Sequence, residues 1–125
     1  MKNTVSLKMN REFQRAYKKG LYKAGRYLVV YALENRLDHN RLGVTTGKRF
    51  GNSVQRNRMR RVIKEIYRLM ESSFHTGYDI VVMAKASERG AATNNNRLKA
   101  INIPEYESTK KDFIKLVTKL NLADL

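Results

Sequence analysis

The sequence predicts an α/β fold in which a small mixed sheet of three to four strands packs with three helices. The chain has 125 residues, of which 42% are hydrophobic, enough for one domain with a modest core. Apolar residues recur at helical spacing in two long segments, 52–70 and 108–120. Segments rich in β-branched and aromatic residues precede and separate them. We therefore treat residues 1–125 as a single domain.

The clearest helix follows Asn52 or Ser53, because either short side chain can cap its start. Its apolar residues fall on one stripe: Met59, Val62, Ile63, Ile66, Leu69 and Met70. The opposite stripe carries Arg56, Asn57, Arg60, Arg61, Lys64 and Arg68, with Arg58 on the flank. Glu65 is the only acid between Lys48 and Arg68, so this face repels itself unless a polyanion lies against it.

The net charge of +15 is localised rather than spread. Residues 1–26 and residues 48–68 each carry +7, from eight basic residues and one acid in each segment. This placement favours a docking surface for a polyanion. The absence of cysteine excludes disulfides and thiolate metal sites, and His39 and His75 are too isolated to suggest a metal site. No apolar run is long enough to span a membrane, and the N-terminus does not resemble a secretory signal, so we expect a cytoplasmic protein.

Near the N-terminus, Asn10 is expected to cap a short helix that runs to about Lys19 and ends at Gly20. Phe13 and Tyr17 lie at i,i+4 on this helix. Spacing alone favours a pair of core anchors. The surrounding cations also allow a second interpretation, a platform on which unpaired bases stack.

Residues 26–33 predict an internal strand, with Tyr31 on one face, and residues 41–46 predict the next strand as its antiparallel hairpin partner. Gly47 and Gly51 then place Lys48 and Arg49 near the start of the basic helix, where backbone amides favour a phosphate. Residues 78–84 form an apolar run typical of a buried strand parallel to a neighbour, which completes a β-α-β unit.

A long polar connection follows at 85–106. Ser108 or Thr109 is expected to cap a final helix whose Phe113, Leu116, Val117 and Leu120 enter the core. No nucleophile–base pair, carboxylate pair, phosphate-binding loop or dinucleotide fingerprint appears in the sequence. We expect no catalytic residue, no bound metal and no small-molecule substrate.

The segment from Gly47 to Arg61 reads Gly-Lys-Arg-Phe-Gly-Asn-Ser-Val-Gln-Arg-Asn-Arg-Met-Arg-Arg. It resembles the signature of the bacterial ribonuclease P protein subunit, with Arg56-Asn57-Arg58 as its core. The resemblance extends to residues 10–20, 26–33 and 78–85 and to the C-terminal helix, so it covers most of the chain. It departs at 85–106, which is longer than expected for the family.

The resemblance implies that the fold is a small α+β sandwich with a left-handed β-α-β crossover, an exception to the usual right-handed rule. It also implies that the protein pairs with a catalytic RNA, which removes the 5′ leader of precursor tRNA using magnesium bound mainly by that RNA. Phe13, Tyr17 and Tyr31 would line the cleft for the leader, which favours the stacking interpretation of the first two. The residues expected to bind the RNA subunit are Lys48, Arg49, Arg56, Asn57, Arg58, Arg60, Arg61, Lys64 and Arg68.

Three other functions fit parts of the sequence. A structural rRNA-binding protein would suit the same charge pattern. A DNA-binding regulator is disfavoured because no paired recognition helix or dimer zipper is visible. A protein-only nuclease is disfavoured because the eleven acids are scattered.

Overall fold

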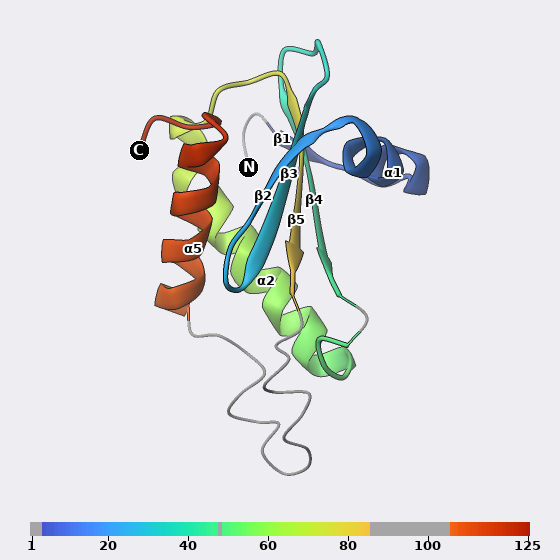
Figure 1. Cartoon of the computed structure of the whole chain (residues 1–125), viewed down its shortest axis with the longest axis vertical. Helices are drawn as coiled ribbons and strands as arrows, with labels where there is room; N and C mark the ends of the chain where they lie inside the picture. Colours follow the sequence, from blue (N-terminus) through green and yellow to red (C-terminus); the bar gives the residue numbers. More distant parts are fainter. Residues whose placement is uncertain (1–3, 48, 86–105) are drawn as a thin grey trace.

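The computed structural model describes residues 4–47, 49–85 and 106–125, so the long connection predicted at 85–106 lies almost entirely outside the described residues. Figure 1 shows a sheet with α1 on one face and with α2 and α5 on the other. The strands are β1 (Thr4–Ser6), β2 (Leu21–Ala24), β3 (Leu28–Glu34), β4 (Asn40–Thr46) and β5 (Tyr78–Ala84). The helices are α1 (Asn10–Lys19), α2 (Ser53–Met70), the short 3-10 turn η1 (Glu71–Ser73) and α5 (Tyr106–Lys119).

The sheet is mixed, as predicted, but it has five strands in the order β1-β4-β5-β3-β2 rather than three to four. The short edge strands β1 and β2 account for the difference. β5 pairs in parallel with β4, so β4, α2 and β5 form the expected β-α-β unit. The predicted hairpin between β3 and β4 is wrong, because β5 lies between them and pairs antiparallel with β3. β5 is a nearly continuous apolar run that is buried on both faces, as is typical of a strand in the interior of a sheet.

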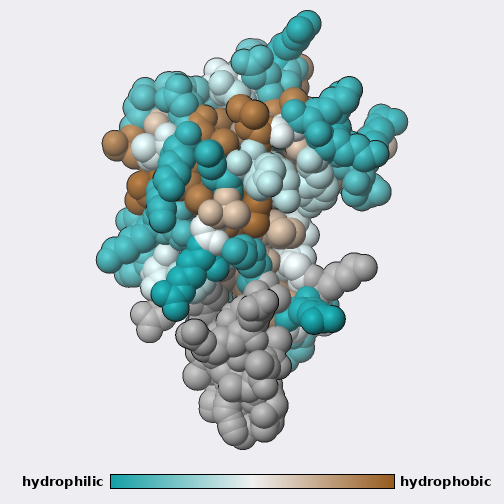
Figure 2. Space-filling view, viewed as in Figure 1, coloured by the Kyte–Doolittle hydropathy of each residue, from teal (hydrophilic) through white to brown (hydrophobic). Residues whose placement is uncertain are grey.

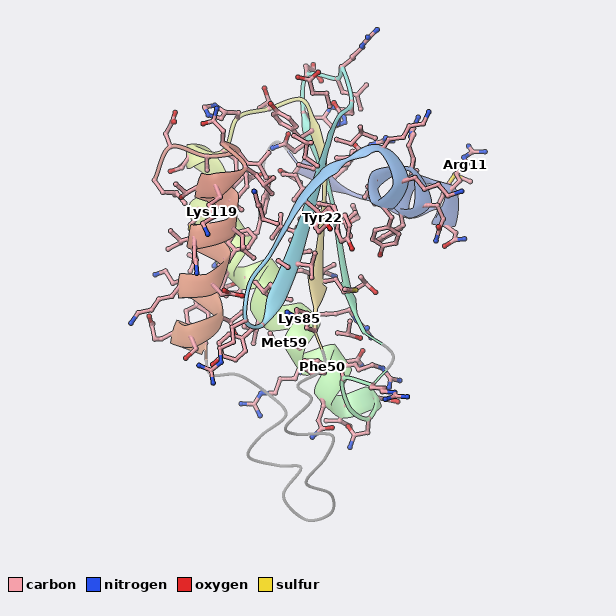
Figure 3. All side chains as sticks on the ribbon, in the orientation of Figure 1. Arg11, Tyr22, Phe50, Met59, Lys85 and Lys119 are labelled. Carbon is pink, nitrogen blue, oxygen red and sulfur yellow. The ribbon has the colours of Figure 1, made fainter. Side chains whose placement is uncertain are left out.

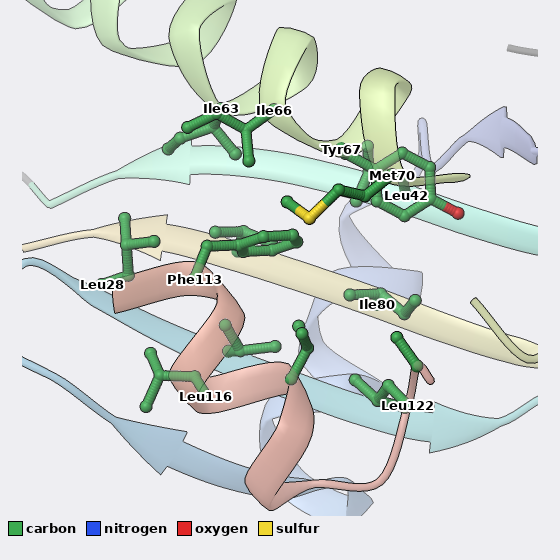
Figure 4. Packing of buried hydrophobic residues seen from close by; sticks show 14 of the residues in the cluster. Leu28, Leu42, Ile63, Ile66, Tyr67, Met70, Ile80, Phe113, Leu116 and Leu122 are labelled. Atoms are coloured by element: carbon green, nitrogen blue, oxygen red, sulfur yellow. The ribbon is translucent and has the colours of Figure 1, made fainter. Parts of the chain in front are cut away.

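The main core lies between the sheet and the helices α2 and α5 (Figure 4). Alternate residues of each central strand point into it, among them Leu28 and Val30 of β3 and Ile80 and Val82 of β5. Phe113, Leu116 and Val117 of α5 are buried there as predicted, whereas Leu120 lies just beyond the helix and is partly buried. The final helix begins at Tyr106, so neither Ser108 nor Thr109 caps it, and Thr109 is fully buried.

α2 follows the predicted phase with one exchange. Met59, Ile63, Ile66 and Met70 are buried, but Leu69 is 57% exposed and Tyr67 takes the place predicted for it. Tyr67 completes the buried stripe because its hydroxyl finds partners at 2.8 Å in Thr4 Oγ1 and at 3.4 Å in Asn40 Nδ2. Burial raises the pKa of the Tyr67 phenol, which keeps this hydroxyl neutral.

α1 is tied to the other face of the sheet by an ion-pair network. The guanidinium of Arg41 donates to both carboxylate oxygens of the buried Asp79, each at 2.7 Å, and to Glu12 Oε2 at 2.9 Å. Glu12 Oε1 also accepts from the backbone amides of Lys8 and Met9, at 3.2 and 3.1 Å. Glu12 thereby satisfies backbone amides just before α1. Asn10, the predicted cap, is instead the first residue of the helix.

Candidate nucleic-acid interface

The first candidate surface is the outer side of α2, which we call the basic face and define as Arg56, Asn57, Arg58, Arg60, Arg61, Lys64 and Arg68. Asn52 caps the helix as one of the two predicted candidates: its Oδ1 accepts from the amide of Gln55, and Gln55 Oε1 accepts from the amide of Asn52, both at 2.9 Å. The buried stripe on the other side of α2 fixes the rotation of the helix. Every residue of the basic face therefore lies at the surface, exposed or half-buried.

Few acids neutralise this face. Glu65 binds Arg68 through two hydrogen bonds of 3.0 and 2.7 Å, and this pair is largely exposed. Arg60 donates to Asn57 Oδ1 at 2.6 Å. Arg58, Arg61 and Lys64 are exposed, and no ion pair with another residue of 4–47, 49–85 or 106–125 holds any of them. Their charge is available to an external polyanion.

The loop before α2 brings a further cation close to the N-terminal end of the helix. Phe50 is 2% exposed, and its amide donates to the carbonyl of Gly47 at 3.1 Å, which closes a tight turn. Arg49 is exposed on this turn. Arg56 donates to the carbonyl of Gly51 at 2.6 Å and so braces the loop against the helix. Lys48, the other predicted phosphate ligand here, falls in a gap of the described chain.

The second candidate surface is a row of aromatic rings, which we call the ring array and define as Phe13, Tyr17, Tyr31 and Tyr22. The ring centroids of Phe13 and Tyr17 are 6.5 Å apart on α1. Tyr17 meets Tyr31 of β3 edge to face at 4.8 Å. Tyr31 in turn stacks with Tyr22 of β2 at 5.6 Å. The three predicted rings are therefore brought together.

The predicted rings have features of both roles considered from the sequence, core anchors and a stacking platform for bases. Phe13, Tyr17 and Tyr31 pack against a small cluster of Leu7, Ala16 and Val81, yet each remains partly exposed. Burial, and then the neighbouring Tyr31, raises the pKa of the Tyr17 phenol, so this ring stays neutral. One side of the array is anchored and the other faces solvent, which a stacking surface requires.

Tyr22 was missed by the sequence reasoning because residues 21–24 form a short edge strand between Gly20 and Gly25, with no clear alternation. The residue Tyr22 is 60% exposed. The signal that could have found it is the register of a hairpin: Tyr22 lies directly opposite Tyr31 in the β2–β3 pair. Tyr22 lies between α5 and α1 in the view of Figure 3.

Cations also lie on the helix that carries two rings of the ring array. Arg11, Arg15, Lys18 and Lys19 are exposed on α1, and Arg11 extends from its outer end (Figure 3). Figure 2 shows hydrophilic residues over much of the same view, with hydrophobic residues gathered between them. A cavity of about 310 Å³ lies beside Arg15, Lys19 and Arg41, and none of the four rings lines it. The candidate interface is thus a charged surface with an aromatic strip rather than an enclosed pocket.

Neither a metal site nor a membrane span emerges from the part of the chain that the structure describes. In that part, no three side chains of His, Asp or Glu are grouped to hold a metal ion. None of its helices is long and apolar enough to cross a membrane.

Comparison with known proteins identifies relatives over nearly the whole chain. The family model described as Ribonuclease P matches residues 1–120. A ribonuclease P protein component from Natranaerobius thermophilus is 36% identical over 122 residues, covering 98% of this chain and 95% of the relative. A structure of the Staphylococcus aureus RNase P protein has a TM-score of 0.74 at 29% identity, covering 95% of this chain and 97% of that one.

A second Staphylococcus aureus structure has the same TM-score, 0.74, at 29% identity, with 94% and 88% of the two chains covered. It is described as an RNase P protein mutant with defective mRNA degradation activity.

Proposed function

The chain belongs to the ribonuclease P protein family, and we propose that it binds the catalytic RNA of ribonuclease P and the 5′ leader of precursor tRNA. In this role it promotes removal of the leader, which gives the mature 5′ end of the tRNA. The main support for this proposal is the basic face. Five of its six cations, all except Arg68, have no acidic partner in the described chain, and a polyanion is the ligand that relieves their mutual repulsion.

The basic face is the proposed contact with the RNA subunit. A helix whose inner side is fixed in the core presents its cations in a constant pattern, so it can neutralise a fixed set of phosphates. Arg49 adds a charge near the first turn of α2, where free backbone amides also favour a phosphate. Lys48 is proposed to join this contact from its position in the sequence alone.

The ring array is the proposed contact with the leader. Bases of a single-stranded leader are free to stack, and an aromatic ring accepts any base because every base has a π-face. The lysines and arginines of α1 lie on the same helix as Phe13 and Tyr17 and can follow the phosphates. This arrangement explains how one surface could accept leaders of different sequence.

Magnesium belongs to the RNA subunit in this proposal. The described residues offer no cluster of acids or histidines that fits a metal ion, so we derive no catalytic step through this chain. The chain's own contribution is electrostatic. Cations that neutralise phosphates lower the amount of magnesium that the RNA needs in order to bring leader and catalytic RNA together.

Degradation of RNA by the protein itself is a second candidate, because the description of the Staphylococcus aureus mutant attributes mRNA degradation activity to that protein. A structural rRNA-binding role is a third. The RNA that co-purifies with the protein from its source cell separates the first role from the third. One RNA of several hundred nucleotides is expected, and ribosomal RNA would contradict the proposal.

The leader contact is tested by affinity for precursor and mature tRNA in the reconstituted enzyme. Phe13→Ala and Tyr17→Ala should each weaken precursor binding by about 1–3 kcal/mol, the usual value for one base on one ring. Mature tRNA should bind almost as before, since it presents no leader. Phe74→Ala, which removes a ring buried in the main core, is the matched control and should lower the thermal stability without separating the two ligands. Equal weakening of both ligands by the Phe13 and Tyr17 variants would show that these rings serve only the fold.

A further inference from the structure

We propose that Tyr22 is a further binding residue for the leader, extending the stacking surface beyond the three predicted rings to the edge of the sheet. The ligand is an unpaired nucleobase of single-stranded RNA. The inference rests on the proposed function, because it assigns Tyr22 to the same leader contact. It adds a residue from a different strand, and it makes the contact one base longer.

The geometry of Tyr22 fits this role. Its ring stacks on Tyr31 at a centroid distance of 5.6 Å with an angle of 30° between the planes. It is nevertheless 60% exposed, far more than a ring that only fills a core. β2 is the last strand of the sheet, so no further strand covers Tyr22 on its outer side. One part of the ring is held by Tyr31 and the rest is open to a ligand.

Two features hold Tyr22 in this place. Gly20 alone separates α1 from β2, and a Cβ there would lie 2.6 Å from the carbonyl oxygen of Ala16 and 2.8 Å from that of Ala32. The close approach brings β2 directly alongside the end of α1. At the other end of the hairpin, the buried Asp112 of α5 accepts hydrogen bonds from the amides of Tyr27 and Leu28, each at 3.0 Å. The β2–β3 hairpin that carries Tyr22 is therefore held at both of its ends.

A purely structural role is the competing explanation. Aromatic residues placed directly opposite each other stabilise antiparallel strands, and Tyr22 and Tyr31 form such a pair. That role needs only the contact with Tyr31 and leaves the exposed part of the ring without a use. Lys18 and Lys19, exposed in the last turn of α1, also provide charges for the phosphates of a strand that passes Tyr22. The combination of an exposed ring and cations at the end of α1 favours RNA binding by Tyr22 over a purely structural role.

The test uses the reconstituted holoenzyme and compares affinity for precursor tRNA with affinity for mature tRNA. Tyr22→Ala should weaken precursor binding about fivefold, the lower end of the range for one stacked base, because the ring is held on one side only. Tyr22→Phe should bind as the natural protein does, since stacking needs the ring and not the hydroxyl. Leu21→Ala is the matched control: Leu21 is the neighbouring residue of β2, 73% exposed, and points to the other side of the strand. It should leave both affinities unchanged.

A spectroscopic measurement supports the affinity test. The chain contains no tryptophan, so Tyr22→Trp creates a single indole whose fluorescence reports on this position. Precursor tRNA should quench it by stacking, and mature tRNA should not.

The outcomes separate this inference from the proposed function. A Tyr22→Ala variant that binds precursor normally, beside a Tyr17→Ala variant that does not, would overturn the role of Tyr22 and leave the leader contact in place. Normal binding by both variants would overturn the leader contact itself. A loss of thermal stability in Tyr22→Ala, with equal weakening of precursor and mature tRNA, would assign Tyr22 to the hairpin alone.

Discussion

The substitution Gly43→Ala should disturb the leader surface without replacing any residue proposed to bind RNA. Gly43 is buried in β4, and its Cα faces the ring of Phe13. An added Cβ would lie 2.5 Å from Phe13 Cε1 and 2.7 Å from Cζ. Carbon atoms pack at about 3.5–4.0 Å, so the ring must retreat by about 1 Å or more. We expect a cost in folding stability of about 1–3 kcal/mol, the usual range for overpacking.

The same retreat should weaken binding of precursor tRNA, by at most the roughly 1–3 kcal/mol that one stacked base contributes. Binding of mature tRNA should not change. The assay measures urea unfolding of the free protein and both tRNA affinities in the assembled enzyme, for Gly43→Ala, Phe13→Ala and the double variant.

The double variant, Gly43→Ala with Phe13→Ala, tests whether the effects of Gly43→Ala arise from its contact with Phe13. Once Phe13 is alanine, the added methyl group has no ring to meet, so the second substitution should add little to either cost. Strictly additive effects on stability and on precursor affinity would show that Gly43 and Phe13 act independently. The reasoning that places Phe13 by its contact with Gly43 would then be wrong.

Two further predictions concern charge. Lys64→Ala should flatten the dependence of log affinity for the RNA subunit on log salt by about 0.7–0.9, the value for one phosphate contact, while Arg68→Ala should change it less because Glu65 already holds Arg68. An unfolded Lys64 variant would place that side chain in the core and contradict the phase of α2. Burial alone would raise the pKa of Asp79, but its hydrogen bonds with Arg41 and Asn35 lower the pKa below its ordinary value. Asp79 therefore stabilises the fold above about pH 4, and this contribution is lost as the pH falls through its lowered pKa. Asp79→Asn should be less stable at pH 7 and should lose less stability on acidification, measured by urea unfolding at both pH values, and an unchanged acid dependence would exclude Asp79 as a cause.

The helical spacing of apolar residues was enough to predict the buried side and the basic face of α2. Met59, Ile63 and Ile66 enter the core, so the cations between them face outward. Periodicity failed at Leu69 and Tyr67, which lie two residues apart: Leu69 was predicted to be buried and is exposed, and Tyr67 is buried. Hydropathy favours leucine, whereas the fold buries tyrosine because Thr4 and Asn40 satisfy its hydroxyl. Those partners lie on β1 and β4, far from α2 in the sequence, so no local pattern indicates them.

The prediction of strand pairing contained the larger error. The short turn between β3 and β4 suggested a hairpin, but β5 separates the two strands. Pairing depends on which edges remain open after the helices pack, and that information is spread over the whole chain. Tyr22 was missed for a related reason: β2 is too short to be predicted, and only its register with β3 brings Tyr22 to Tyr31. The aromatic surface could be predicted for α1 and β3 but not for the edge strand.

The measurement that tests the central claim most directly is cleavage of precursor tRNA at low magnesium, with the RNA subunit alone, the protein alone and both together. Neutralisation of phosphates by the basic face should allow the two components together to release the leader under conditions where the RNA alone is slow. The protein alone, supplied with magnesium and free of RNA, should release none. Cleavage by the protein alone, or an RNA subunit indifferent to its presence, would contradict the account.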